Sequence, residues 1–175
     1  MSSCSRRNRL GVKPTAEGPS WDRKQGELRI HGRRYLAFDA QPFCEFLDSL
    51  IGERVAEVLI KNLQSRYGKE DGLRLRKENP NASLDELIRI TTELDRMAGV
   101  GVTQASLVGP GSNSIALKIS NPSVKGSKGA AKAFFFAWWA GVMSSYLGKD
   151  FDYANVVYDQ ETNTMNCEIL PRNPP

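Results

Sequence analysis

The chain has 175 residues, of which 40% are hydrophobic and 25% are charged, and its formal net charge is +4. This composition is ordinary for a globular protein and excludes wholesale disorder, while the length suits one domain rather than two. Cys4, Cys44 and Cys167 are odd in number and widely spaced, which argues against a disulfide framework. No long apolar run follows the N-terminal charges, so we expect no secretory signal and a cytoplasmic location.

Residues 1–25 mix Ser, Arg, Gly, Pro and Lys with few apolar groups. We expect a flexible basic tail there, followed by a single domain over residues 26–172. Two short extended runs from Glu27, with a His-Gly turn between them, predict a β-hairpin. His31 in this turn is the only histidine of the chain, so it has no histidine partner for metal or triad chemistry.

Apolar residues recur at three- and four-residue steps after Pro42, which predicts a long amphipathic helix over residues 40–67. Asp39 can cap its start, and Gly68 is suited to end it. Gly52 interrupts the helix and indicates a close contact with another backbone.

The next predicted elements are a helix and a strand. Ser83 and Glu86 have the spacing of a capping box, which predicts a second helix over residues 84–97. Residues 115–120 alternate between apolar and small or polar side chains, as a strand with one buried face does. The segment NPSVKGSKG that follows has a flexible composition and is expected to act as a lid or as a connector.

The most apolar stretch runs from Ala133 to Met143 and has no polar side-chain group besides the indole N–H groups of two tryptophans. A helix that is hydrophobic on every side must be buried against protein, lipid or a hydrophobic ligand, and this run is too short to span a membrane. We therefore expect a helix over residues 131–148 inside a soluble domain. It is either a central core helix or the wall of a pocket for a flat or greasy molecule.

The segments DYANVVYD and TMNCEIL, on either side of a QETN turn, predict a hairpin that closes the fold. Taken together, the elements predict an α+β fold in which an antiparallel sheet of about four strands is packed with helices.

The sequence has no Walker loop, no Rossmann glycine motif, no His-Glu-x-x-His motif and no paired-cysteine spacing. No catalytic residue can be named, so we expect neither a metal nor a cofactor and favour a protein that is not an enzyme. Cys44 is expected to be a small buried hydrophobe, with acylation or oxidation as the alternative. The basic residues form no stripe on a predicted helix, so nucleic-acid binding is not expected.

Three segments resemble the 4-vinyl reductase domain family, which comprises small hydrocarbon-binding domains related in fold to the TRAPP trafficking subunits. SRYGKEDG (65–72) resembles the end of the family's first long helix, and MAGVGVTQASLV (97–108) resembles its glycine-rich start of a strand. FFFAWWAGVMSSYLGKDF (134–151) and NCEIL (166–170) resemble its C-terminal helix and final strand. The resemblance covers about residues 33–170 and implies a TRAPP-like ligand-binding domain, a small hydrophobic ligand and a homodimer.

The resemblance also implies what this chain has lost. Family members that sense phenolic compounds hold a zinc ion with a glutamate and two cysteines, at spacings that would place the ligands on Val156, Asp159 and Cys167. Valine cannot bind zinc, so we expect that the zinc site is absent. The histidine that often precedes the apolar helix in the family is missing from residues 132–136.

The resemblance implies a pocket wall made of apolar residues from the last helix and the first. From the last helix these are Phe134, Phe135, Phe136, Trp138, Trp139 and Met143, and from the first helix they are Phe43, Phe46, Leu47 and Leu50.

Three functions fit the sequence. The first is non-enzymatic binding of a small hydrophobic ligand by a sensor or carrier domain. The second is reduction of a bacteriochlorophyll-type tetrapyrrole at its 4-vinyl group, or delivery of that substrate. The third is TRAPP-like protein–protein assembly through the helices. We favour the first, because no motif for a reducing cofactor is present.

Overall fold

The structure is a computed structural model that describes residues 20–22, 27–30, 33–35, 39–109 and 114–172. Its contacts divide the chain into two compact units, Met1–Phe38 and Asp39–Pro175, and each unit is described by itself. Most of the predicted tail over residues 1–25 lies outside the described residues, and the predicted domain span of 26–172 stays a prediction.

The first unit contains a three-stranded antiparallel sheet in the order β1-β2-β3. Its strands are β1 (Ser20–Asp22), β2 (Glu27–Ile30) and β3 (Arg33–Tyr35). In the β2–β3 pair Ile30 lies opposite Arg33, which confirms the predicted hairpin, although its His-Gly turn lies outside the described residues. β1 falls within the predicted tail. It is a strand because its backbone pairs with β2, and its sequence has no apolar pattern from which it could be predicted.

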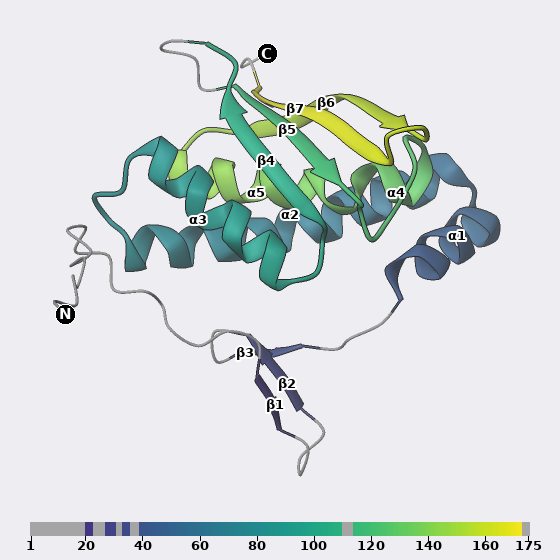
Figure 1. The fold of residues 1–175 in the computed structure, drawn as a ribbon, viewed down its shortest axis with the longest axis horizontal. Coiled ribbons are helices and arrows are strands. Elements are labelled where there is room, and N and C mark those ends of the chain that lie inside the picture. The colour runs from purple at the N-terminus through teal and green to yellow at the C-terminus, as the bar shows by residue number, and fades with distance from the viewer. Residues whose placement is uncertain (1–19, 23–26, 31–32, 36–38, 110–113, 173–175) are drawn as a thin grey trace, which may run out of the picture. The chain divides into compact units, whose positions relative to one another are not determined.

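The second unit contains a four-stranded antiparallel sheet in the order β4-β5-β7-β6 (Figure 1). The strands are β4 (Val102–Leu107), β5 (Ile115–Ser120), β6 (Phe151–Asp159) and β7 (Thr164–Pro171). The α+β class and the sheet of about four strands are therefore confirmed, as is the closing β6–β7 hairpin. β5 buries Ile115, Leu117 and Ile119, the face that its alternation predicts.

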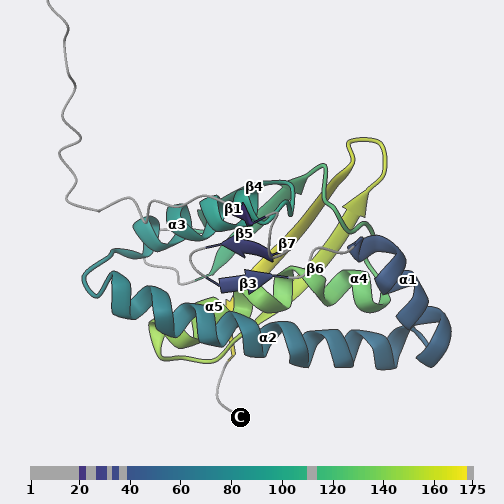
Figure 2. The same ribbon diagram turned by 90° about the horizontal axis from the view of Figure 1, so that it is seen from below.

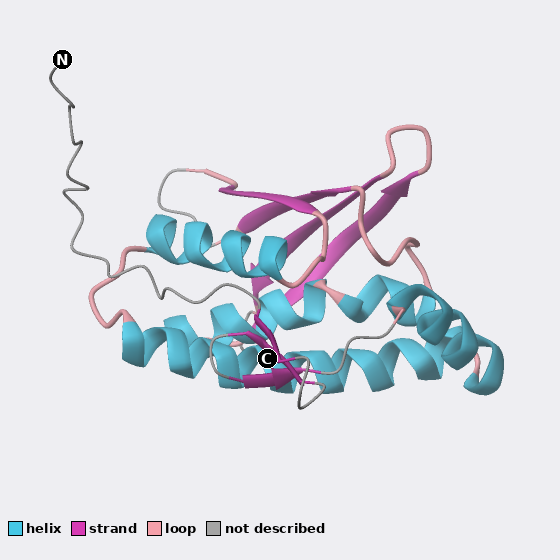
Figure 3. Ribbon diagram, turned by 60° about the horizontal axis from the view of Figure 1, so that its bottom comes forward, coloured by secondary structure: helices cyan, strands magenta, loops and turns pink. Residues whose placement is uncertain are grey.

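The helices of the second unit lie on one side of its sheet (Figure 3). Among the described residues they are α1 (Ala40–Ile51), α2 (Glu53–Glu78), α3 (Leu84–Met97), α4 (Gly129–Phe134) and α5 (Phe136–Leu147). The Ser83 side chain accepts a hydrogen bond from the Glu86 N–H at the start of α3, as the capping box predicts. None of the helices formed by the described residues is long and apolar enough to cross a membrane.

The predicted first helix differs from the structure at both of its glycines. It is two helices, α1 and α2, with Gly52 between them at a φ of +81°, and α2 continues to Glu78. A Cβ atom on Gly52 would meet nothing within 4 Å, so the predicted close contact there is wrong. Glycine suits this position because the left-handed backbone region disfavours other residues.

The close contact occurs instead at Gly68, which lies inside α2 and does not end it. A Cβ atom on Gly68 would lie 2.1 Å from the carbonyl oxygen of Trp138 in α5. A Cβ atom on Gly141, across the same helix pair, would lie 2.3 Å from the carbonyl oxygen of Ser65. The backbones of α2 and α5 thus touch where both helices lack side chains.

The predicted apolar helix over residues 131–148 is also two helices, which meet at Phe135. α5 lies between the sheet and α2: the Phe151 N–H of β6 donates to Ser144 Oγ, and the Ser65 hydroxyl of α2 donates to the Ala137 carbonyl oxygen. Eight of its twelve residues are buried, so the prediction that this helix is surrounded by other atoms is confirmed.

Candidate functional site

The two tryptophans of α5 hold different parts of the second unit. The Trp138 indole N–H donates to Asp71 Oδ2 in α2 at 3.0 Å, and the Trp139 indole N–H donates to Asp95 Oδ2 in α3 at 2.8 Å. Their rings meet edge to face, with centroids 6.2 Å apart. Adjacent residues of one helix therefore make matching contacts with two buried aspartates.

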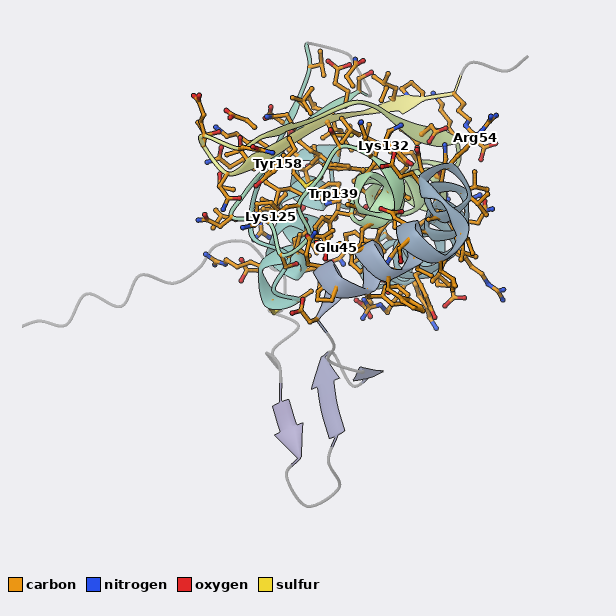
Figure 4. The ribbon with its side chains drawn as sticks, turned by 90° about the vertical axis from the view of Figure 1, so that its right-hand side faces the viewer. Glu45, Arg54, Lys125, Lys132, Trp139 and Tyr158 are labelled. Carbon is orange, nitrogen blue, oxygen red and sulfur yellow. The ribbon has the colours of Figure 1, made fainter. Side chains whose placement is uncertain are left out.

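Asp95 is the more deeply buried of these aspartates, with 3% of its surface exposed. The Thr103 hydroxyl of β4 donates to the same oxygen, Oδ2, at 2.9 Å. Trp139, which is itself wholly buried, is labelled in Figure 4 within the interior of the second unit. The Asp95 carboxyl thus joins α3, β4 and α5 in a core that is otherwise mostly apolar.

The electrostatics of the two aspartates differ. Asp71 has a cationic neighbour, Arg74, whose Nη2 lies 3.3 Å from its carboxylate. None of the ion pairs between described residues includes Asp95, and a buried carboxylate without a cation is costly. Burial accordingly raises the pKa of Asp95 to about 7, although the hydrogen bonds from Trp139 and Thr103 favour the ionised form. Near neutral pH the group can accept a hydrogen bond as a carboxylate or donate one as an acid.

The structure separates the two groups of predicted pocket residues. On α5 and the end of α4, Phe135, Phe136, Trp139 and Met143 are buried, while Phe134 and Trp138 are half-buried. On α1, Phe43, Phe46 and Leu50 are exposed, and Leu47 is half-buried. Most of the predicted pocket residues of the last helix therefore lie in the interior, whereas most of those on the first helix face outward. Their role in ligand binding stays a prediction.

Sequence reasoning missed Asp95 and Thr103, although a signal for the first was present. Leu87 and Ile88 are buried on α3, and Thr91 and Asp95 follow on the same helix face at four-residue steps. A carboxylate on the apolar side of an amphipathic helix is unusual, because charged groups are seldom fully buried. Thr103 gave no comparable signal, since threonine is common in strands.

The described surface of the second unit has several hollows, and two of them border α3 or α1. One, of about 550 Å³, lies between α3 and β4 and is lined by residues that include Ile88, Thr92 and Gln104. The other, of about 330 Å³, is polar, and its lining includes Glu45, Lys125 and Tyr158, which are labelled in Figure 4.

The segment predicted as a lid or connector borders the second hollow and is held to α1. The Lys125 N–H of the segment donates to Gln41 Oε1 at 2.6 Å, and the N–H of Ala130, which directly follows the segment in α4, donates to Asp48 Oδ1 at 2.8 Å. Cys44 is buried beside it, and burial together with the carboxylates of Asp48 and Glu45 raises the pKa of its thiol to about 12. The thiol is thus protonated at neutral pH, which disfavours acylation or oxidation there.

Cys167, the last of the implied zinc positions, is buried on β7, and burial raises the pKa of its thiol to about 12. Within the described residues, no three or more His, Cys, Asp or Glu side chains are grouped so that they could hold a metal ion.

No family model matches this chain, and no curated protein matches it. Among solved structures, it is similar to the phenol-responsive sensory domain of the transcription activator PoxR, crystallised with phenol. The TM-score is 0.69 at 15% identity, over 95% of this chain and 90% of that one. The chain has the fold of that sensory domain. A vinyl-4-reductase family protein from Methanocaldococcus jannaschii is also found, with a TM-score of 0.41 and 16% identity over 79% of this chain and 100% of that one.

The PoxR sensory domain confirms the ligand-binding-domain fold that the sequence resemblance implies. At 15% identity this similarity is one of fold. What the fold does in this chain has to be argued from its own residues.

Proposed function

We propose that the second unit is a non-enzymatic sensor or carrier domain that binds a small, mostly apolar molecule bearing one hydrogen-bonding group. The observation that carries this proposal is the Asp95 carboxyl, which lies in an apolar core with two neutral donors and no cation among the described residues. Small-molecule sites are mostly apolar, with a few polar groups that fix the ligand's orientation. A core built only for stability gains little from such a carboxyl.

The hydrogen bonds around Asp95 define the class of ligand. Trp139 and Thr103 both donate to Oδ2. Among the described residues no hydrogen bond to Oδ1 is found, which leaves this oxygen for a ligand. As a carboxylate, Oδ1 accepts a hydrogen bond from a hydroxyl or an amine, and burial among apolar side chains strengthens that bond. An aromatic hydroxyl compound fits both requirements, and the PoxR domain with the same fold was crystallised with phenol.

The hollow between α3 and β4 supports a route to this site. It is lined by Thr92 and Gln104, which are close in sequence to Asp95 and Thr103. α3 packs chiefly on β4, so the ligand enters if these two elements separate. Because protein interiors are close-packed, binding also requires core side chains to shift.

The test is a calorimetric titration of the full chain with phenol, and with toluene as a ligand of similar shape that lacks the hydroxyl. We expect phenol to bind more tightly than toluene. Replacing Asp95 by Asn should weaken phenol binding by roughly tenfold or more, because hydrogen bonds to charged groups contribute about 1.5–3 kcal/mol.

Asp71→Asn is the matched control, since Asp71 also accepts a tryptophan N–H but is paired with Arg74. It should leave the affinity for phenol unchanged. Native mass spectrometry of the protein as purified extends the search to other hydrophobic compounds. If neither phenol nor any co-purified apolar compound binds, the proposal is wrong; if phenol binds equally well to wild type and Asp95→Asn, Asp95 is not its partner.

A further inference from the structure

β4 is one of the two edge strands of the four-stranded sheet, whose order is β4-β5-β7-β6. It pairs with β5 residue by residue over its whole length, from Val102 to Leu107. No other described strand pairs with it. Figures 1 and 2 both show α3 alongside this strand. The side of β4 that is away from β5 is thus a free sheet edge among the described residues.

The backbone of β4 directs half of its hydrogen-bonding groups to this free edge. At the end of the β4–β5 pair, the Val108 N–H donates to the Ser114 carbonyl oxygen at 3.0 Å. Hydrogen-bonded and non-hydrogen-bonded residues alternate along an antiparallel pair, so the even-numbered residues of β4 bond to β5. Thr103, Ala105 and Leu107 therefore present their N–H and C=O groups outward. Beyond the sheet, no backbone hydrogen bond between described residues involves Ala105 or Leu107.

The other edge strand, β6, differs from β4 in its regularity. Its pairing with β7 shifts between Ala154 and Val157, and Asn155 there has a φ of +55°. A bulge of this kind twists a strand and makes its edge a poor template for further pairing. β4 has no register shift, no proline and no charged residue, so it lacks the features by which proteins protect an edge strand.

The hollow of about 550 Å³ between α3 and β4 lies along this free edge. Its lining includes four consecutive residues of β4, from Gln104 to Leu107, and one side of α3 between Asp85 and Glu93. Alternate side chains of a strand point to opposite faces of the sheet. Four consecutive residues can therefore line one hollow only where it follows the backbone edge. Its α3 wall includes Ile88, which is buried and apolar.

The α3 wall of this hollow has charges of alternating sign. Asp85, Arg89 and Glu93 line it at four-residue steps, and all three are exposed. Such steps are about 6 Å apart along a helix, and side chains on one face of an extended chain repeat at about 6.6 Å. Glu93 is paired with Arg96 at 2.9 Å, whereas no ion pair between described residues includes Asp85 or Arg89. Alternate side chains of an extended segment beside β4 would therefore meet these charges in turn.

We propose that the free edge of β4 is a docking site for an extended segment of a partner protein. The segment adds a strand antiparallel to β4 and carries a basic side chain and, two residues later, an acidic one. In strand addition the main-chain hydrogen bonds give affinity, and alternate side chains give specificity.

The order of the two charges follows from the direction of α3. Thr103, at the start of β4, bonds to Asp95 near the end of α3, so these two elements run in opposite directions. A segment antiparallel to β4 runs in the direction of α3 and meets Asp85 before Arg89. Its base therefore comes before its acid. The site uses the outer edge of β4 and does not depend on ligand binding at Asp95.

The experiment follows amide hydrogen exchange in the full chain by NMR, with and without a probe peptide. The probe is the acetylated and amidated heptapeptide Val-Thr-Lys-Thr-Asp-Thr-Val, added up to millimolar concentration. In the free protein the Ala105 and Leu107 amides should exchange much faster than those of Gln104 and Ser106, which bond to β5. The peptide should slow exchange at Ala105 and Leu107 by roughly tenfold or more, because their N–H groups then donate to its backbone.

Two pairs of peptides are the matched controls. Exchanging Lys and Asp keeps the composition and should weaken binding by roughly tenfold, because two exposed attractions become repulsions. The Asp amide of the probe faces β4, so its N-methylation should abolish binding. The amide of the central Thr faces away from β4, and its N-methylation should be tolerated.

A pair of protein variants tests the charges of the hollow. Arg89→Glu should abolish the preference for the probe over the peptide with exchanged charges, because each peptide then makes one attraction and one repulsion. Arg54→Glu is the control, since Arg54 is exposed on α2 and lies outside the hollow. This variant should keep the preference.

Several results would overturn the proposal. Slow exchange of Ala105 and Leu107 in the free protein at every concentration means that the chain itself covers the edge. Slow exchange that is lost on dilution means that a second copy covers it. No slowing at millimolar probe, or slowing that N-methylation of the Asp amide leaves intact, means that the probe adds no strand to β4.

Discussion

The second unit has two helical regions with more apolar surface than one face can use, and they differ in what covers them. α5 is apolar on nearly every side and is buried between the sheet and α2. The first half of α2 is apolar on its inner and outer sides, but only the inner side is covered by the second unit. The apolar sides of a helix must be buried. The second unit buries α5 on nearly every side, but it buries the first half of α2 on the inner side alone.

The two regions also differ in their polar groups. α5 carries two indole N–H groups that donate to Asp71 and Asp95. Burial of this helix therefore places a few specific hydrogen bonds in an otherwise apolar interior. The outer side of the first half of α2 offers mainly apolar side chains, among them Val55, Val58 and Leu59. The first arrangement suits recognition of a small molecule with one polar group, and the second suits a flat protein–protein contact.

The largest expected effect comes from breaking the contact between the backbones of α2 and α5. Gly68→Ala would place a Cβ atom 2.1 Å from the backbone oxygen of Trp138, and α2 would have to move away from α5. We expect a loss of about 4 kcal/mol in the free energy of unfolding, measured by urea denaturation. In Gly109→Ala the new Cβ atom meets nothing within 4 Å, so this control should be unaffected. Equal stability of the two variants would show that the helices do not touch.

The pH dependence of stability tests the buried Asp95 carboxyl beside α5. The pKa of Asp95 is about 7 in the folded protein, against an ordinary value of 3.8. Below pH 3.8 the Asp95 carboxyl is neutral in both the folded and the unfolded state. Between pH 3.8 and about 7 it is ionised only in the unfolded chain, so the folded state becomes less stable as the pH rises. Above about pH 7 the carboxyl is ionised in both states, and the loss of stability has reached its full size. We expect wild type to lose roughly 3–4 kcal/mol relative to Asp95→Asn between pH 4 and pH 8. Parallel stability curves for the two proteins would contradict the raised pKa.

A smaller effect is expected at Thr103, whose hydroxyl donates to Asp95. Thr103→Val keeps the shape of the side chain and removes that hydrogen bond, so the unfolding free energy should fall by about 1 kcal/mol at pH 8, where Asp95 is ionised. The fall should be smaller at pH 5. Thr91→Val is the control, because the Thr91 hydroxyl donates to the Leu87 carbonyl oxygen of its own helix and not to Asp95. The same loss in both variants would mean that the carboxyl plays no part.

Much of the fold could be predicted from the sequence, because it is encoded in local patterns. Alternation predicted β5, the capping box predicted α3, and the apolar composition of residues 133–143 predicted burial of α5. The roles of the glycines could not be predicted. Gly68 has the sequence context of a helix end, and only the approach of Trp138, 70 residues further along the chain, makes it a packing contact.

The candidate site was predicted only in part, for a related reason. The aromatic residues of α5 are adjacent in sequence, so their clustering was visible. Asp95 and Thr103 meet Trp139 only because α3, β4 and α5 converge in three dimensions. Periodicity placed Phe46 and Leu50 on an apolar helix face, but it could not say whether that face points to the core or away from it.

The smallest expected effect concerns the outer side of the first half of α2, and it distinguishes this surface from the core. Because Val58 is 55% exposed, Val58→Glu should change the unfolding free energy of the monomer by less than about 0.5 kcal/mol. If the outer side of α2 joins two copies in the homodimer that the sequence resemblance implies, the effect of Val58→Glu falls instead on the concentration dependence of the melting temperature. A dimer that dissociates on unfolding melts at a higher temperature when the protein is more concentrated. Wild type should therefore show this dependence in calorimetry, and Val58→Glu should lose it while melting near the value of dilute wild type. Val157→Glu on β6 is the control, because Val157 is also 55% exposed but lies on the sheet, and it should keep the dependence. If Val58→Glu instead lowers the melting temperature at every concentration by as much as a core substitution does, the outer side of α2 is packed within its own chain, and α2 differs from α5 only in which part of the chain covers it.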